Sequence, residues 1–224
     1  EYNYTADEVT TVDFDGGEGE DSFLLTGSDE GTETVTFWPT TGSATGLGYS
    51  VTLTSVEQKT AQAGLGVDDI AHLYGTNDND QMVGSAAEIN LSGPGYQSRA
   101  VGFRYAHGYA QQGTNDTATL QGSDGKDTFS SRQEYSVISN STFLVRAKGF
   151  DTVTAQGTKG QEDFAELFGT KGNDTFTARP EEAVVVGSGL TRSVTGFDYV
   201  HCYAYYGGYD EAYLYDSPGY EELM

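Results

Sequence analysis

Apolar and polar residues alternate along most of this chain with a period of two. Around 163–177, for example, Ala165 and Leu167 point to one side of an extended segment while Phe164 and Glu166 point to the other. Such alternation over short runs is typical of strands with one buried face. No segment shows a convincing long helical period. The sequence therefore predicts an all-β protein built from short strands, for instance at 88–91, 135–138 and 183–186.

The pattern recurs every 47 residues. A similar eight-residue phrase opens at Asp69, Asp116, Asp163 and Asp210, and a Gly-Phe pair recurs at the same interval. A fixed period indicates a structural unit stacked on copies of itself. Three apolar columns keep this period: Ala71, Ala118, Ala165 and Ala212; Leu73, Leu120, Leu167 and Leu214; Met82, Phe129, Phe176 and Leu223.

These repeats divide the chain into a single array over 1–224. The array consists of a partial unit (1–20), four repeats (21–68, 69–115, 116–162 and 163–209) and a second partial unit (210–224). We expect four strands per repeat, joined by Gly-rich corners. Short strands with stacked apolar columns predict a parallel β-solenoid, a right-handed β-helix. The alternative is a β-sandwich with internal duplication.

The repeated aspartates bear on how many coils one repeat contains. If one repeat were one coil, Asp69, Asp116, Asp163 and Asp210 would stack about 4.8 Å apart. Like charges at that distance repel by roughly 1 kcal/mol per pair in water. Two coils of about 23 residues would double the spacing, so this interpretation is favoured.

The charge limits the possible partners. The chain has 34 acidic and 11 basic residues, a formal net charge of -23. Phosphate backbones and anionic membrane surfaces would be repelled, so we expect no nucleic-acid partner. No apolar run is long enough to predict a membrane span. Cys202 is the single cysteine, and we expect it to be a free, buried thiol. These features favour a secreted protein at a bacterial cell surface, in a salty or calcium-rich milieu.

Glycine-rich turns that end in aspartate offer candidate metal ligands. The segment 16–24 has the full pattern Gly-Gly-x-Gly-x-Asp-x-(large apolar)-x, and 122–129 and 169–176 each lack only its second glycine. Glycine permits turns in which carbonyls converge, and aspartate adds the hard oxygen that calcium prefers. The candidate metal residues are Gly16, Gly17, Gly19, Asp21, Asp80, Gly125, Asp127, Asp163, Gly172 and Asp174.

These motifs resemble the calcium-binding repeats of RTX, or hemolysin-type, secreted bacterial proteins, and more loosely large repetitive bacterial surface proteins. The resemblance implies a parallel β-roll or β-helix, export and calcium-dependent folding, with Asp21, Asp127 and Asp174 as ligand carboxylates. Here, however, the matches do not recur every nine residues as they do in RTX arrays. The alternative is plain turn chemistry, because Asp and Asn side chains bond nearby backbone N–H groups.

Aromatic residues mark a candidate binding surface. Tyr199, Tyr203 and Tyr205 lie in a dense tyrosine run, and Tyr109 occupies the same repeat position as Tyr203. An exposed aromatic stripe could stack on sugar rings or on a neighbouring subunit. Packing within the core is the alternative. His107 and His201 also share a position, and we expect them to be half-exposed strand residues rather than metal ligands.

No catalytic constellation is evident, so we expect a protein that is not an enzyme. The favoured function is a structural repeat protein of an extracellular fibre, surface layer or adhesin, stabilised by calcium and stacking head to tail. The alternative is a carbohydrate-binding module of a secreted polysaccharide-acting enzyme. A lyase or epimerase is a third hypothesis, and it depends on fold analogy alone.

Overall fold

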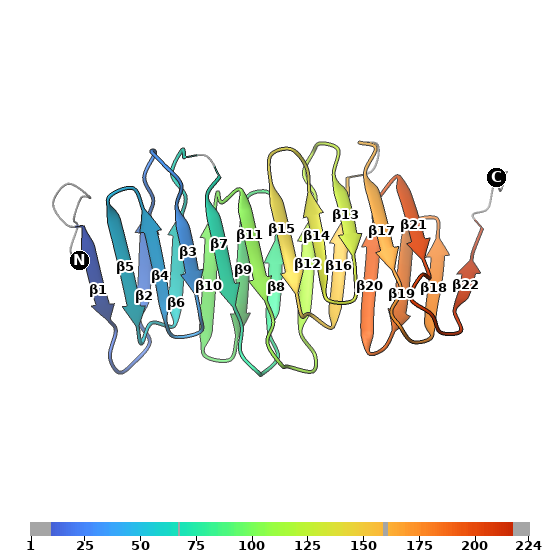
Figure 1. Cartoon of the computed structure of the whole chain (residues 1–224), viewed down its shortest axis with the longest axis horizontal. Helices are drawn as coiled ribbons and strands as arrows, with labels where there is room; N and C mark the ends of the chain where they lie inside the picture. The colour runs from blue at the N-terminus through green and yellow to red at the C-terminus, as the bar shows by residue number, and fades with distance from the viewer. Residues whose placement is uncertain (1–9, 67, 159–160, 217–224) are drawn as a thin grey trace.

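The computed structural model describes residues 10–66, 68–158 and 161–216, which form two facing sheets of eleven strands each (Figure 1). Sheet A contains β1 (Thr11–Asp15), β5 (Tyr49–Thr54), β4 (Gly42–Gly46), β3 (Thr34–Phe37), β7 (Ile70–Tyr74), β11 (Tyr105–Tyr109), β15 (Leu144–Lys148), β14 (Tyr135–Ser139), β13 (Thr128–Ser131), β17 (Phe164–Phe168) and β21 (Tyr199–Tyr203), in that spatial order. Sheet B contains β2 (Ser22–Thr26), β6 (Gln58–Gln62), β10 (Tyr96–Val101), β9 (Glu88–Gly93), β8 (Gln81–Gly84), β12 (Thr117–Gln121), β16 (Thr152–Gln156), β20 (Leu190–Thr195), β19 (Glu182–Gly187), β18 (Asp174–Arg179) and β22 (Glu211–Leu214).

The chain winds between the two sheets as a β-solenoid of about six turns, which confirms the predicted fold class. Most neighbouring strands are parallel, as in the pairing of β7 with β11 and of β12 with β16. At regular intervals the chain stays in one sheet for three antiparallel strands before crossing over. These meanders are β3–β5 and β13–β15 in sheet A, and β8–β10 and β18–β20 in sheet B.

One 47-residue repeat contains five strands, not the predicted four. The second repeat, for example, runs from β7 to β11. Each repeat consists of two single strands and one three-stranded meander, so the chain crosses between the sheets three times per repeat. Because three is odd, equivalent strands of successive repeats lie in opposite sheets: β7 in sheet A, β12 in sheet B and β17 in sheet A. Between β7 and β17 the chain makes three turns, through β11 and then through β13–β15. One repeat is therefore one and a half turns, and both the one-coil and the two-coil interpretations were wrong.

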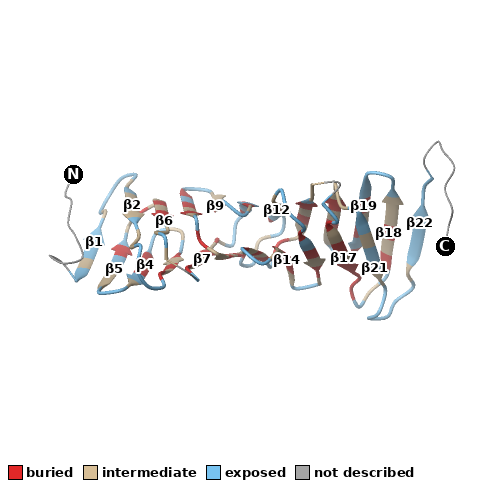
Figure 2. Ribbon diagram, turned by 90° about the horizontal axis from the view of Figure 1, so that it is seen from above, coloured by how far each residue is buried: buried red, intermediate tan, exposed pale blue. Residues whose placement is uncertain are grey.

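The core is a layer of inward-facing side chains between the sheets, visible as buried bands that alternate along the strands (Figure 2). The predicted apolar columns supply much of it: Ala71, Leu73, Met82, Leu120, Phe129, Ala165 and Leu167 are all fully or almost fully buried. Successive members of a column enter the core from opposite sheets. Leu223 lies outside the described residues. Leu214, on the terminal strand β22, is 71% exposed because no described strand covers it.

Two cations are buried in this apolar layer. Lys59 on β6 is 1% exposed, and its Nζ donates to the carbonyl oxygens of Val56 (2.6 Å) and Pro39 (2.8 Å). Burial lowers the pKa of Lys59 to about 8. Arg192 on β20 donates to the carbonyls of Phe150 and Asp151. Both cations are thus solvated by backbone oxygens of the solenoid corners.

Candidate functional site

The predicted metal-binding aspartates close the turns that precede several strands. Asp80, Asp127 and Asp174 each fold back on their own turn, where one carboxylate oxygen accepts the backbone N–H of the Ser or Thr four residues earlier, at 2.8, 2.5 and 2.7 Å. The hydroxyl of the same residue donates to the carboxylate as well. Each turn is therefore a closed unit in which the aspartate satisfies local donors.

Each of these turns opens with a glycine because the carboxylate of the aspartate lies too close to the glycine Cα for a Cβ to fit, and not because the backbone φ is positive. A Cβ built on Gly75 would lie 2.1 Å from Oδ2 of Asp80, and one on Gly169 would lie 2.5 Å from Oδ2 of Asp174. Neither glycine has a positive φ, and neither do Gly125 and Gly172. At Gly75 and Gly169 glycine is therefore required because the carboxylate occupies the space of a side chain. Among the predicted metal residues, Gly17 and Gly19 do have positive φ.

The aspartates of adjacent rungs form ladders. The backbone N–H of Asp80 donates to Oδ1 of Asp116 at 2.8 Å, and the N–H of Asp116 donates to Oδ2 of Asp151 at 2.9 Å. On sheet A, Asp127 bonds Asp163 in the same way at 2.7 Å. Further rungs of this kind join Glu33 to Asp69, Asp174 to Asp210 and Asp21 to Glu57.

These ladders change the expected spacing of charges. Asp69 and Asp163 belong to sheet A, and Asp116 and Asp210 to sheet B, so the four repeated aspartates do not stack on one another. Each instead neighbours an acid of another repeat position, 35 or 36 residues away. Burial is the main cause that raises the pKa of Asp69 and of Asp116, and the adjacent carboxylates add to it. The N–H donors partly offset this cost.

The structure therefore occupies the candidate metal oxygens with hydrogen-bond donors. In the described part of the chain, no group of three or more His, Cys, Asp or Glu is placed so that it could hold a metal ion. Asp21, in the full Gly-Gly-x-Gly-x-Asp match, lies apart from the other turns, and its Oδ2 is buried without a partner. Calcium binding at these turns stays a prediction from the motif.

A second feature lies on the outer face of sheet A. Along eight adjacent strands, one outward-facing residue in each strand or directly after its end falls on a single line across the sheet, and every one is aromatic or basic. We call this line the aromatic–cation row. In spatial order it comprises Trp38, Tyr74, Tyr109, Lys148, Tyr135, Arg132, Phe168 and Tyr203.

The rings of the row stack along the solenoid axis. Tyr74 and Tyr109 have ring centroids 4.4 Å apart and planes 7° apart, and Trp38 stacks on Tyr74 at 5.2 Å and 11°. At the other end, Phe168 stacks on Tyr203 at 4.7 Å and 20°. In-register parallel strands hold identical side chains at about the strand spacing, so such ladders are geometrically natural on a solenoid.

Tyr109 is the centre of a polar cluster beside the row. Its hydroxyl accepts a hydrogen bond from Nη2 of Arg146 at 2.7 Å and lies 3.2 Å from Nδ1 of His72. His72 stacks on His107 at 5.0 Å. Burial, with Arg146 and His72 nearby, lowers the pKa of His107 to about 4, and His72 is shifted in the same direction. Both imidazoles are therefore neutral at physiological pH.

Sequence reasoning located part of this surface. Tyr109 and Tyr203 are in the row, and Tyr199 lies on the same face of β21, 56% exposed. Tyr205 follows β21 and packs at 5.1 Å against Tyr203. His107 is half-buried on β11, as expected. Cys202, expected to be buried, is exposed on the terminal strand β21.

The other members of the row were missed because they occupy different positions in the 47-residue repeat. The available signal was a second spacing: Tyr74 and Tyr109 are 35 residues apart, and paired parallel strands elsewhere are 35 to 39 residues apart. Alignment on 47 residues cannot reveal it, because that interval connects residues on opposite sheets.

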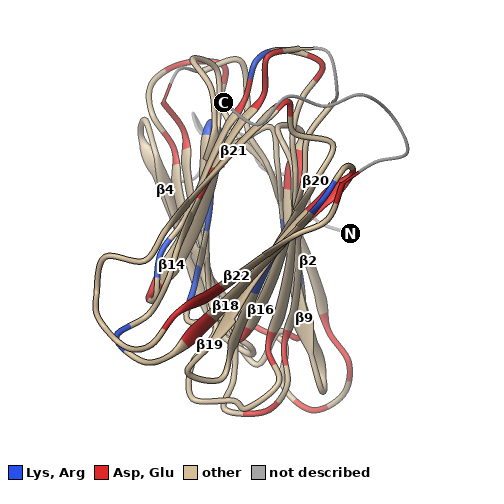
Figure 3. Ribbon diagram, turned by 90° about the vertical axis from the view of Figure 1, so that its right-hand side faces the viewer, with Lys and Arg blue, Asp and Glu red and all other residues tan. Residues whose placement is uncertain are grey.

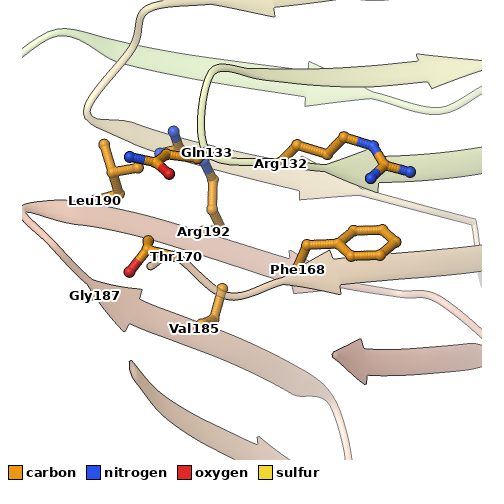
Figure 4. A pocket seen from close by; sticks show the side chains of 8 residues that line it. All are labelled: Arg132, Gln133, Phe168, Thr170, Val185, Gly187, Leu190 and Arg192. Atoms are coloured by element: carbon orange, nitrogen blue, oxygen red, sulfur yellow. The ribbon is translucent and has the colours of Figure 1, made fainter. Parts of the chain in front are cut away.

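Two hollows in the described surface differ greatly in size. One is lined by Arg132, Phe168 and Arg192 among others and has a volume of about 10 Å³, about enough for one water molecule (Figure 4). Figure 4 also shows Arg132 and Phe168 side by side on the sheet, with the guanidinium carbon 4.1 Å from the ring centre. A wider, open hollow of about 550 Å³ lies on the outer face of sheet B over β2, β6, β9 and β10.

Comparisons with known proteins give no relative: no family model, no curated protein and no solved structure matches the chain. The resemblance to RTX repeats consequently stays a prediction. In the described residues, no helix is long and apolar enough to cross a membrane.

Proposed function

We propose that this protein is a non-enzymatic, extracellular β-solenoid of a cell surface that binds a polysaccharide along the outer face of sheet A. The aromatic–cation row carries this proposal. It presents a line of rings across the sheet, roughly 34 Å long, since it crosses eight adjacent strands about 4.8 Å apart. Most of these rings are partly exposed, and Phe168 is 8% exposed. A line of this kind fits an extended polymer better than a compact small molecule.

The chemistry of the row suits sugar rings. The apolar faces of pyranose rings pack against aromatic side chains, and Tyr hydroxyls supply hydrogen bonds at the ring edges. Exposed aromatic side chains gathered on one face often mark an interaction surface. Trp38, 41% exposed, is the end ring of its stack and has its face toward Tyr74 covered, so the exposed remainder of the indole offers one such surface. Tyr205, 70% exposed and tilted by 31° beside Tyr203, offers another. Repetition along the strands, rather than one enclosed pocket, favours binding over catalysis.

Affinity electrophoresis in gels that contain soluble polysaccharides tests this proposal. We expect at least one polymer to retard the wild-type protein. We expect Tyr109→Ala and Tyr74→Ala each to lower the apparent affinity, calculated from the retardation, at least tenfold. Tyr213→Ala is the matched control, because Tyr213 is an exposed tyrosine on the outer face of β22 in sheet B. Equal retardation of all three variants would contradict the proposal, provided that their melting temperatures match.

A structural role, with solenoids stacked head to tail, is the second candidate. It is favoured by the terminal strands of the described residues, β21 and β22, whose inward-facing positions are largely uncovered (Figure 2). A further rung, from more chain or from a second copy, would bury Val200 and Leu214 and pair the open strand edges. Sedimentation and electron microscopy test it: filaments that disappear in Leu214→Asp support stacking, and monomers at high concentration contradict it.

A further inference from the structure

On five central strands of sheet A the outer face carries a charge opposite to that of the whole molecule, whereas Glu166 on β17 and Asp13 and Asp15 on β1 are acidic residues nearer the two ends of that face. The chain carries a net charge of -23, with the acidic side chains mainly at the turns on the two edges of the solenoid (Figure 3). Yet the outward-facing positions of β7, β11, β15, β14 and β13, together with Arg132 directly after β13, contain three cations, two histidines and no carboxylate. The cations are Arg132, Arg146 and Lys148.

Two of these cations lie within the aromatic–cation row itself. Lys148 is paired in register with Tyr109 on one side and with Tyr135 on the other. Arg132 lies between Tyr135 and Phe168, and its guanidinium covers the Phe168 ring. In the middle of the row, from Tyr109 to Phe168, flat rings therefore alternate with positive charges along the direction in which a polymer would run.

Within the described residues, none of these three cations forms an ion pair with a carboxylate. Arg146 donates to a phenol, Tyr109, and its guanidinium carbon lies 5.4 Å from that ring. Arg99 occupies the equivalent position one repeat earlier, on sheet B, and there it forms an ion pair with Glu88. The same repeat position thus carries a paired arginine on one sheet and an arginine without a carboxylate partner on the other.

We propose that the ligand of this face is an anionic polysaccharide, in which sugar rings stack on the aromatic residues and the acid groups bind Lys148, Arg132 and Arg146. This inference rests on the proposed function and narrows its ligand class. Carboxylate and sulfate groups share the chemistry that these cations recognise. The phosphates of a nucleic acid share this anionic chemistry, so tighter binding of an oligonucleotide is the outcome that would overturn the inference.

Binding to four soluble polymers tests the inference: a neutral β-glucan, polygalacturonate, dextran sulfate and single-stranded oligodeoxythymidylate. We expect polygalacturonate or dextran sulfate to bind at least tenfold more tightly than the β-glucan, with an affinity that falls as salt rises. Preference for polygalacturonate identifies a carboxylated ligand, and preference for dextran sulfate a sulfated one. Preference for the oligonucleotide would overturn the inference.

Charge variants locate the anionic contact. We expect the double variant Arg132→Gln, Lys148→Gln to lose at least tenfold in affinity for the anionic polymer and most of the salt dependence, while Arg99→Gln on sheet B changes neither. Binding of the β-glucan as tightly as the anionic polymers, with no salt dependence, would overturn this inference and leave the proposed function intact. Absence of binding to every polysaccharide would contradict both.

Discussion

Tyr96 donates its phenolic hydrogen to Oδ1 of Asp80 at 2.6 Å, and both side chains are almost fully buried. The bond ties the β9–β10 hairpin to the turn before β8. One repeat later the tyrosine is replaced by Phe143, and Asn140 donates to Oδ1 of Asp127 instead, at 2.9 Å. The two changes must occur together for steric reasons. Gly93 is the position equivalent to Asn140, and a Cβ on Gly93 would lie 2.7 Å from the Tyr96 ring.

The Tyr96–Asp80 hydrogen bond predicts that Tyr96→Phe destabilises the protein and that the turn of residues 140–143, placed at 93–96, restores the stability. Tyr96→Phe leaves the buried carboxylate of Asp80 with one donor fewer, which we expect to lower the free energy of unfolding by about 1–3 kcal/mol. Replacing residues 93–96 with the Asn-Ser-Thr-Phe of 140–143 supplies the amide donor and should recover most of the loss. Urea denaturation measures both. A Tyr96→Phe variant as stable as wild type would show that the bond contributes nothing.

The ladders predict opposite results for two similar substitutions. Both carboxylate oxygens of Asp163 accept backbone N–H groups, from Asp127 and from Thr158, so Asp163→Asn must place an amide against a donor. We expect a cost of about 2–3 kcal/mol. Oδ2 of Asp116 has no partner, and its neighbours include Asp80 and Asp151.

Asp116→Asn removes this buried, repelled charge, so we expect its stability at neutral pH to stay within about 1 kcal/mol of wild type or to exceed it. Thermal or urea unfolding of both variants under the same conditions makes the comparison. The account of the ladders would be wrong if Asp116→Asn were the more destabilising of the two.

Lys59 predicts a rise in stability on the alkaline side. Its folded-state pKa is about 8, below the value of about 10.4 for an unfolded lysine, so between these values the unfolded state binds more protons. The contribution of Lys59 to stability therefore increases with pH from about 8 to about 10, by up to ~1.4 kcal/mol per pH unit. Unfolding measured against pH should show this slope in wild type and not in Lys59→Met. Parallel curves would contradict it.

The sequence predicted the strands and the solenoid, but not the path of the chain. Alternation at residues such as Ala165 and Leu167 reflects burial on one face, and burial is what the core requires. The 47-residue period does not reveal the crossovers, because a meander such as β8–β10 and a pair of crossing strands produce the same period-two pattern. Whether Ala118 lies in the same sheet as Ala71 or in the facing sheet depends on how many times the chain crosses between the sheets on the way from one to the other.

The candidate sites were predictable to different degrees. Asp127 and Asp174 were recognised as turn residues, and turn chemistry was the stated alternative to calcium. Their ladder partners, such as Asp163 for Asp127, emerge only from the register of strands 36 residues apart. Trp38 was not singled out, because its neighbour Tyr74 belongs to another repeat position.

Calcium dependence is directly testable. Because the turn carboxylates already accept N–H and O–H donors, we expect a chelator to leave the melting temperature unchanged and isothermal titration with calcium to give no saturable heat. Sodium at matched ionic strength controls for screening of the net charge. A melting temperature that rises with calcium but not with sodium would support the metal site predicted from the glycine motifs.

Trp38 allows the most direct measurement on the central claim, that the outer face of sheet A binds an anionic polysaccharide. It is the only tryptophan in the chain, it is 41% exposed and it forms one end of the aromatic–cation row. Titration with polygalacturonate or dextran sulfate should change its fluorescence in a saturable manner that weakens as salt rises, and Tyr109→Ala should reduce the affinity. A polymer that binds the protein without changing Trp38 fluorescence would contradict the claim.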